Sequence, residues 1–145
     1  MKLKISVYAL SLVLLTACSG PTPFAHAPAE LATDGHNARN SLDWNGSYEG
    51  ILPCADCEGM KVRLTLKLDG SYELRTWYLG RPTPPELTHG NFTWQADGAH
   101  IRLDAAGHGQ IFFIAEERIF WLQPDGTRVD GPQADSYVLK RVRKA

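Results

Sequence analysis

The chain has 145 residues, of which 43% are hydrophobic and 21% are charged, and its formal net charge at pH 7 is −1. A chain of this length is expected to hold one domain of ordinary size. The near-zero net charge argues against nucleic acid as a partner, because proteins that bind nucleic acids usually carry a clearly basic domain.

Residues 1–17 have the layout of a secretory signal peptide. Lys2 and Lys4 precede an apolar run over residues 5–15, which is too short to span a bilayer as a permanent helix. The tetrapeptide that ends at Cys18 resembles a bacterial lipobox, so we expect Cys18 to be acylated and to become the mature N-terminus. An ordinary cleaved signal with an unrelated cysteine is the alternative. Two or more acyl chains would anchor the protein stably without crossing the membrane.

Residues 18–41 are expected to form the acylated N-terminus and a flexible linker. They contain prolines at positions 21, 23 and 28 and no sustained apolar period. His26 and His36 lie in this linker and are expected to be solvated. Ser19 follows the cysteine and, by resemblance to bacterial lipoproteins, favours the outer membrane of a Gram-negative cell.

Residues 42–145 are expected to form one all-β domain. They consist of short runs of alternating apolar and polar residues that are separated by turn signals. The clearest run covers residues 60–68, with Val62, Leu64, Leu66 and Leu68 on the core face. Further strands are expected over residues 44–52, 71–79, 87–95, 101–103, 111–114, 119–122 and 137–142. About eight antiparallel strands with short connections can close into an up-and-down barrel without exposed edges, and a two-sheet sandwich is the alternative.

Cys54 and Cys57 lie three positions apart, in the loop between the first two predicted strands. An oxidising compartment favours a disulfide between them. Reduced thiolates would instead select Cu(I), with Met60 as an auxiliary ligand. A thiol oxidoreductase is the third interpretation, but a strand-loop-strand setting lacks the helix N-terminus that commonly activates such a thiol.

A family resemblance is carried by the stretch Trp44-x-Gly46-x-Tyr48-x-Gly50-x-Leu52-Pro53-Cys54-Ala55-Asp56-Cys57-Glu58-Gly59, by Asp69-Gly70-Ser71-Tyr72 and by Gly90-x-Phe92-x-Trp94. The chain resembles the N-terminal domain of the NlpE family of copper-resistance and envelope-stress lipoproteins. The resemblance implies a small lipocalin-like β-barrel, held at the outer membrane and facing the periplasm. It also implies a link to copper tolerance and contact with an envelope-stress sensor kinase. Longer family members carry a second, OB-like domain, which we do not expect here.

No hydrolytic motif is evident, so we expect a protein that is not an enzyme and that requires no cofactor, although Cu(I) is a candidate ligand. Two other functions stay open. A lipocalin-like carrier of an apolar ligand would need a cavity lined by aromatic side chains, but packing of these side chains into a core is the simpler expectation. An inhibitor of a periplasmic enzyme would need a protruding loop, for which residues 80–86 are the candidate. Association into a homodimer also stays open.

The remaining basic and histidine residues carry no clear site. Lys140, Arg141, Arg143 and Lys144 form a basic run, which we interpret as a solvated edge. Contact with anionic lipid head groups is the alternative interpretation. His89, His100 and His108 are expected to be surface or turn residues rather than metal ligands.

Overall fold

The computed structural model of the chain describes residues 36–143. The predicted signal peptide, Cys18 and most of the predicted linker lie outside the described residues. Within the described part, no helix has the length and the apolar character that crossing a bilayer would require.

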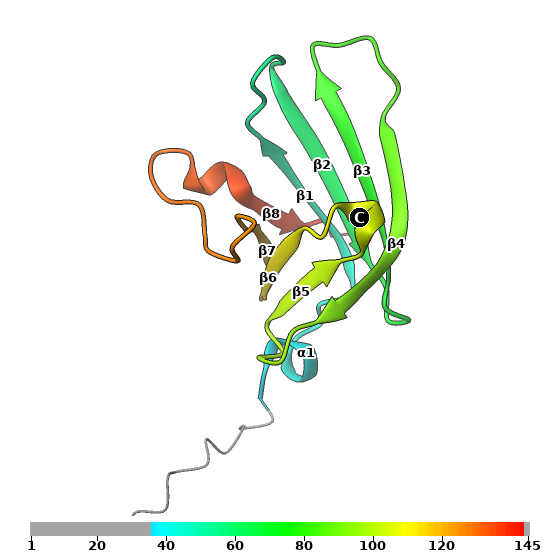
Figure 1. Cartoon of the computed structure of the whole chain (residues 1–145), viewed down its shortest axis with the longest axis vertical. Coiled ribbons are helices and arrows are strands. Elements are labelled where there is room, and N and C mark those ends of the chain that lie inside the picture. The colour runs from blue at the N-terminus through cyan, green and yellow to red at the C-terminus, as the bar shows by residue number, and fades with distance from the viewer. Residues whose placement is uncertain (1–35, 144–145) are drawn as a thin grey trace, which may run out of the picture. The chain divides into compact units, whose positions relative to one another are not determined.

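The described residues form eight β-strands with three short helical turns (Figure 1). The strands are β1 (Gly46–Leu52), β2 (Gly59–Leu66), β3 (Ser71–Leu79), β4 (Glu86–Trp94), β5 (His100–Leu103), β6 (Ile111–Ala115), β7 (Arg118–Trp121) and β8 (Val138–Arg141). The helical turns are α1 (Ala38–Ser41) and the 3-10 turns η1 (Ala105–Gly107) and η2 (Ala134–Tyr137).

The strands close into a single antiparallel barrel. Each strand pairs with the next one along the chain, and β1 pairs with β8. This arrangement confirms the predicted eight-stranded up-and-down barrel and excludes the two-sheet sandwich. Gly70 has a φ of 84°, so a residue without Cβ fits the predicted hairpin turn between β2 and β3.

The core lies inside the barrel and follows the predicted alternation. On β2, the side chains of Val62, Leu64 and Leu66 are at most 1% exposed. Leu68, which is predicted to lie on the same face, is 75% exposed. That prediction is wrong because β2 ends at Leu66 and the chain has already entered the turn.

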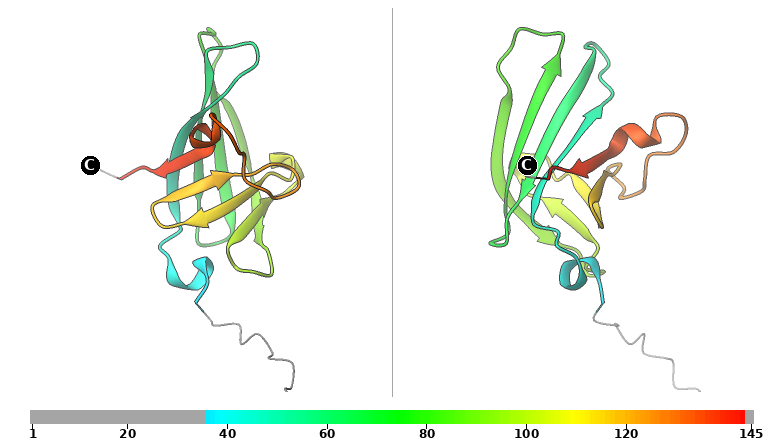
Figure 2. Two further views of the ribbon diagram at one scale, coloured as in Figure 1. Left: turned by 90° about the vertical axis from the view of Figure 1, so that its left-hand side faces the viewer. Right: turned by 180° about the vertical axis from the view of Figure 1, so that it is seen from behind.

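The four longest strands extend beyond the closed part of the barrel (Figures 1 and 2). The pairing between β4 and β5 covers only residues 92–94 of β4, and β8 pairs with only two residues of β1. The loops at residues 53–58 and 80–85 therefore stand together at the extended end of β1–β4. We call this end the open end of the barrel.

Two hydrogen-bond networks, one centred on Asp104 and one on Arg141, attach irregular segments of the chain to the barrel. Tyr72 Oη donates a hydrogen bond of 2.9 Å to Asp104 Oδ1, and the backbone N–H of Asn91 donates one of 2.7 Å to Asp104 Oδ2. Burial raises the pKa of Tyr72, and the hydrogen bond to Asp104 raises it further. The Asn91 amide, helped by Tyr72, lowers the pKa of Asp104. Asp104 thus links β3, β4 and η1, whose Gly107 amide also donates to Asp104.

The second network centres on Arg141 at the end of β8. Its guanidinium donates hydrogen bonds to the backbone oxygens of Asp43 and Asn45 and to Tyr48 Oη. Tyr48 Oη in turn donates a hydrogen bond of 2.7 Å to the backbone oxygen of Trp44. The interpretation of Arg141 as part of a solvated edge is therefore wrong, because its guanidinium donates hydrogen bonds to backbone carbonyl groups that precede β1.

The ordered domain begins earlier than residue 42, inside the segment predicted as linker. The Asn37 side chain accepts a hydrogen bond of 3.2 Å from the Asn40 amide and caps α1. Ala38 packs against the core, and the Arg39 amide donates to the Gly98 backbone oxygen at 2.9 Å. Sequence alone missed this turn because four residues are too few for a periodic signal.

Candidate functional site at the open end of the barrel

The two cysteines of the β1–β2 loop are joined by a disulfide. Cys54 and Cys57 have Cα atoms 5.3 Å apart and are partly exposed, while Ala55 and Asp56 between them are exposed. Asp56 Oδ1 lies 3.6 Å from Cys54 Sγ, but a disulfide sulfur carries no proton to donate. The structure thus confirms the disulfide that the oxidising compartment predicted.

The disulfide loop is attached to the neighbouring β3–β4 loop. Arg81 Nη2 donates to the Asp56 backbone oxygen at 3.1 Å and also forms an ion pair with the Asp56 carboxylate. The Glu58 amide donates to the Leu79 backbone oxygen at 3.3 Å. Gly80 has a φ of 77°, and a Cβ there would come within 2.9 Å of the Glu58 side chain. The two loops of the open end therefore form one surface.

Three potential metal ligands meet in this loop. The ligand atoms of Cys54, Asp56 and Cys57 lie within 4.8 Å of one another. Two thiolates suit Cu(I), whereas a carboxylate oxygen suits harder cations. Because the sulfurs are bonded to each other and Asp56 is held by Arg81, the loop can offer two thiolates to Cu(I) only after reduction.

Met60 lies on the inward side of β2 and not on the exposed face of the disulfide loop. It pairs in register with Leu52 and Tyr78 and packs against the core. In this arrangement Met60 is a partly buried side chain at the edge of the core, and its role as an auxiliary ligand stays a prediction.

The histidines lie apart from the disulfide loop. His89 is exposed on β4, and His108 has a φ of 56° at the end of η1. His100 pairs with Asp97 and lies against the Phe113 ring. These placements confirm the expectation that they are surface or turn residues.

The aromatic side chains mainly fill the barrel. Tyr48 and Phe112 are fully buried, and Trp44, Trp94 and Trp121 pack against the same core cluster. Two further aromatic side chains, which could have lined such a cavity, face outward instead. Trp77 lies under Lys61 and Arg75, and Phe113 lies under Arg128. The arrangement agrees with a packed core rather than a continuous aromatic cavity.

Sequence reasoning missed Arg81, the residue that attaches the disulfide loop to the β3–β4 loop. Residues 81 and 56 are 25 positions apart, and only the register of β2 with β3 brings them together. The sequence carries one weak signal, since Arg81 directly follows a glycine at a loop start and is the only basic residue between Arg75 and Arg102.

The fold and the site define a class of protein: a small closed β-barrel with a Cys-x-x-Cys disulfide in its first hairpin loop. The family model of the NlpE N-terminal domain matches residues 48–132. The chain therefore belongs to the NlpE N-terminal domain family, as the cysteine motif and its flanking residues predicted.

Known proteins support this assignment. The chain is 29% identical over 85 residues to Lipoprotein NlpE of Escherichia coli K12, a match that covers 58% of this chain and 36% of that protein. The chain is also similar to a crystal structure of a candidate lipoprotein from Shewanella oneidensis, with 39% identity and a TM-score of 0.68. This match covers 72% of this chain and 94% of the Shewanella chain.

A further crystal structure, of the Cpx pathway activator NlpE from E. coli, is similar with 27% identity and a TM-score of 0.51. The match covers 59% of this chain and 46% of that chain. The similarity to E. coli NlpE thus concerns less than half of that protein's length.

Proposed function

We propose that the chain is a lipid-anchored protein of the outer membrane that faces the periplasm and takes part in copper tolerance and envelope-stress sensing. The observation that carries this proposal is the exposed Cys54–Cys57 loop at the open end of a barrel of the NlpE family. The name of the E. coli relative, Lipoprotein NlpE, and its description as an activator of the Cpx pathway support the assignment.

In this proposal, the cysteine loop binds Cu(I) after its disulfide has been reduced to two thiols. A dithiol reductant transfers two electrons and two protons to the disulfide, which yields two thiols on the chain and a disulfide on the reductant. Binding of Cu(I) then displaces the thiol protons, since thiolates are the ligands. The chain needs no catalytic group for this function, and we propose that it acts by contact with an envelope-stress sensor protein.

Anchoring through Cys18 is the second part of the proposal. An acylated N-terminus would hold the barrel near the membrane, and the lipobox-like sequence that ends at Cys18 supports it. Mass spectrometry of the chain purified from membranes tests this part. Acyl chains on Cys18 are expected, and a free Cys18 in an otherwise intact precursor contradicts it.

Copper tolerance of cells tests the function directly. A strain that lacks this gene is complemented with the natural chain, with a Cys54→Ser, Cys57→Ser variant, or with an Arg102→Gln control. The natural chain and the control should restore growth at inhibitory copper concentrations, and the double variant should not. Full restoration by the double variant would show that the cysteine loop has no part in copper tolerance.

A further inference from the structure

The outer surface of strands β8, β1, β2 and β3 gathers basic side chains in register. Arg63 on β2 lies opposite Arg75 on β3 and opposite Glu49 on β1, and Glu49 lies opposite Lys140 on β8. Directly opposed residues point to the same side of a sheet, and the intervening residues of these strands, such as Tyr48 and Val62, are buried. The charged row therefore faces outward.

Trp77 lies next to this row on β3. The Lys61 Nζ atom is 5.4 Å from the Trp77 ring centroid, and the Arg75 guanidinium carbon is 5.9 Å from it. We call the surface formed by Lys61, Arg63, Arg75, Trp77 and Lys140 the basic face. Figure 1 shows the strands that carry it side by side.

The basic face has an excess of positive charge. Glu49 is shared between Lys61, at 3.9 Å, and Arg63. Glu73 pairs with Arg75 at 2.9 Å. Lys140 forms no ion pair within the described part of the chain, and it lies opposite a further cation, Arg118 of β7. The chain as a whole has a net charge of −1, so the rest of the chain is negative while this face is positive. Such an asymmetry of charge orients the molecule with this face toward anionic surfaces.

Apolar groups accompany the charges. Ile51 on β1 is 56% exposed and lies opposite Lys61, which itself lies opposite Trp77. A tryptophan with exposed aliphatic and basic neighbours is the composition of surfaces that rest on a membrane, because the ring sits at the head-group level while the cations reach lipid phosphates.

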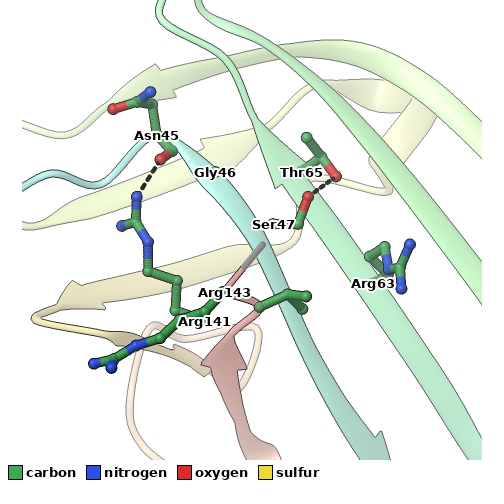
Figure 3. Close-up of a pocket in the computed structure, with 8 residues that line it drawn as sticks. Asn45, Gly46, Ser47, Arg63, Thr65, Arg141 and Arg143 are labelled. Carbon is green, nitrogen blue, oxygen red and sulfur yellow. Dashed lines mark hydrogen bonds between the residues drawn. The ribbon is translucent and has the colours of Figure 1, made fainter. Parts of the chain in front are cut away.

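A hollow of about 690 Å³ adjoins the basic face (Figure 3). Its lining includes Arg63, Arg141, Arg143 and the hydroxyl groups of Ser47 and Thr65, which hydrogen bond to each other at 2.8 Å. The described hydrogen bonds of Arg141 go to backbone oxygens and a tyrosine hydroxyl rather than to a carboxylate. The lining of this hollow holds three arginines, Arg63, Arg141 and Arg143, and no acidic residue, which suits a phosphate group nearby.

We infer that the basic face binds the surface of an anionic phospholipid bilayer. The face spreads over four adjacent strands, about 15 Å across at the usual strand spacing, so it matches an extended charged surface better than a single small anion. The inference deepens the proposed function, since it rests on a lipid anchor that holds the barrel near a membrane. Residues 19–35 between Cys18 and the described domain reach at most about 60 Å when extended, enough for this face to meet the bilayer.

Vesicle binding tests the inference with a chain of residues 19–145. This chain lacks the signal peptide and Cys18, and it keeps the closed barrel and its core, which lie within residues 36–143. It is sedimented with phosphatidylcholine vesicles that contain or lack phosphatidylglycerol. Binding is expected only to the anionic vesicles, and it should weaken as the salt concentration rises.

A pair of matched variants locates the binding surface. Lys61→Gln with Lys140→Gln removes two charges from the basic face, and Arg39→Gln with Arg102→Gln removes two exposed charges from α1 and β5. Each lost charge should weaken binding about fivefold, so the first variant should bind anionic vesicles about 25-fold more weakly than the natural chain. The control variant should bind them less than about threefold more weakly. Circular dichroism verifies that both variants are folded.

Several results would overturn the inference. One is an equal loss of affinity in the two variants, another is equal binding to neutral and anionic vesicles, and another is no binding to anionic vesicles at low salt. Binding to heparin without binding to anionic vesicles would likewise overturn it, in favour of a soluble polyanion. The test chain carries neither an acyl group nor copper, so these outcomes leave the copper and anchoring proposals to their own experiments.

Discussion

Arg81 reaches across the open end of the barrel and donates hydrogen bonds to Asp56, the residue that directly precedes Cys57 in the disulfide loop. The side chains of Arg81 and Asp56 are 41% and 77% exposed. An exposed ion pair of this kind contributes little to global stability, on the order of 0 to 1 kcal/mol. Its consequence is local, since it ties the loop of the two cysteines to the β3–β4 loop.

The Arg81→Gln variant should therefore loosen the disulfide loop without unfolding the barrel. We expect faster amide hydrogen exchange at Glu58, whose N–H bonds to the Leu79 backbone oxygen, and a change of less than about 1 kcal/mol in the free energy of unfolding. The Arg102→Gln variant is the control. Unchanged exchange at Glu58 would mean that Arg81 does not hold the loop.

Removal of the disulfide should lower stability by a modest amount. In the chain-entropy model, a closed loop of about four residues contributes roughly 2 kcal/mol. The Cys54→Ser, Cys57→Ser variant is expected to lose that amount in urea unfolding and to keep the circular dichroism spectrum of the barrel. A loss above about 4 kcal/mol would show that the loop is needed for the fold itself.

Asp104 should make stability dependent on acid pH. Its pKa is lowered in the folded chain, first by the Asn91 amide and then by Tyr72. A lowered folded-state pKa gives stability that is present above the unfolded value of about 3.9 and is lost as pH falls through the folded value. Unfolding of the natural chain should become easier below about pH 4.

The Asp104→Asn variant tests this assignment. It should be less stable than the natural chain at pH 7, and its stability should fall less steeply between about pH 4 and pH 2. Parallel pH profiles for the two chains would show that another carboxylate governs acid unfolding.

Arg141 should be far more important for stability than its neighbour Arg143. The Arg141→Gln variant leaves the carbonyl groups of Asp43 and Asn45 without their donor, which should cost about 1 to 3 kcal/mol in the free energy of unfolding. Arg143 is 83% exposed and, among residues 36–143, forms an ion pair with Glu117 alone, so Arg143→Gln should change stability by less than about 0.5 kcal/mol. Similar losses in both variants would refute the structural role of Arg141.

The sequence predicts the barrel well because the signal is local. Alternation over residues 60–66 and 71–79 marks two strands, and Asp69 with Gly70 supplies the turn between them. Further runs of strand-forming residues follow in chain order, most of them joined by short turns, and eight such strands can close into a barrel in which each pairs with the next. The prediction for Leu68 is wrong because alternation alone does not say where a strand ends.

The candidate site was predictable only in part. Cys54 and Cys57 are visible as a spaced pair, and their disulfide follows from compartment chemistry. Arg81, Arg141 and the register of Lys61 with Trp77 depend on which strands become neighbours and on which face each residue takes. A one-residue shift would reverse those faces, and sequence periodicity does not fix the register to that precision.

Cu(I) titration of the reduced chain of residues 19–145 tests the central claim most directly, because that chain contains only the two cysteines of the loop. A chromophoric Cu(I) chelator competes for the metal, and the Cys54→Ser, Cys57→Ser variant is titrated in parallel. The account predicts that each reduced natural chain takes one Cu(I) from the chelator. The variant is predicted to take none. Equal Cu(I) affinity in the two chains would contradict it.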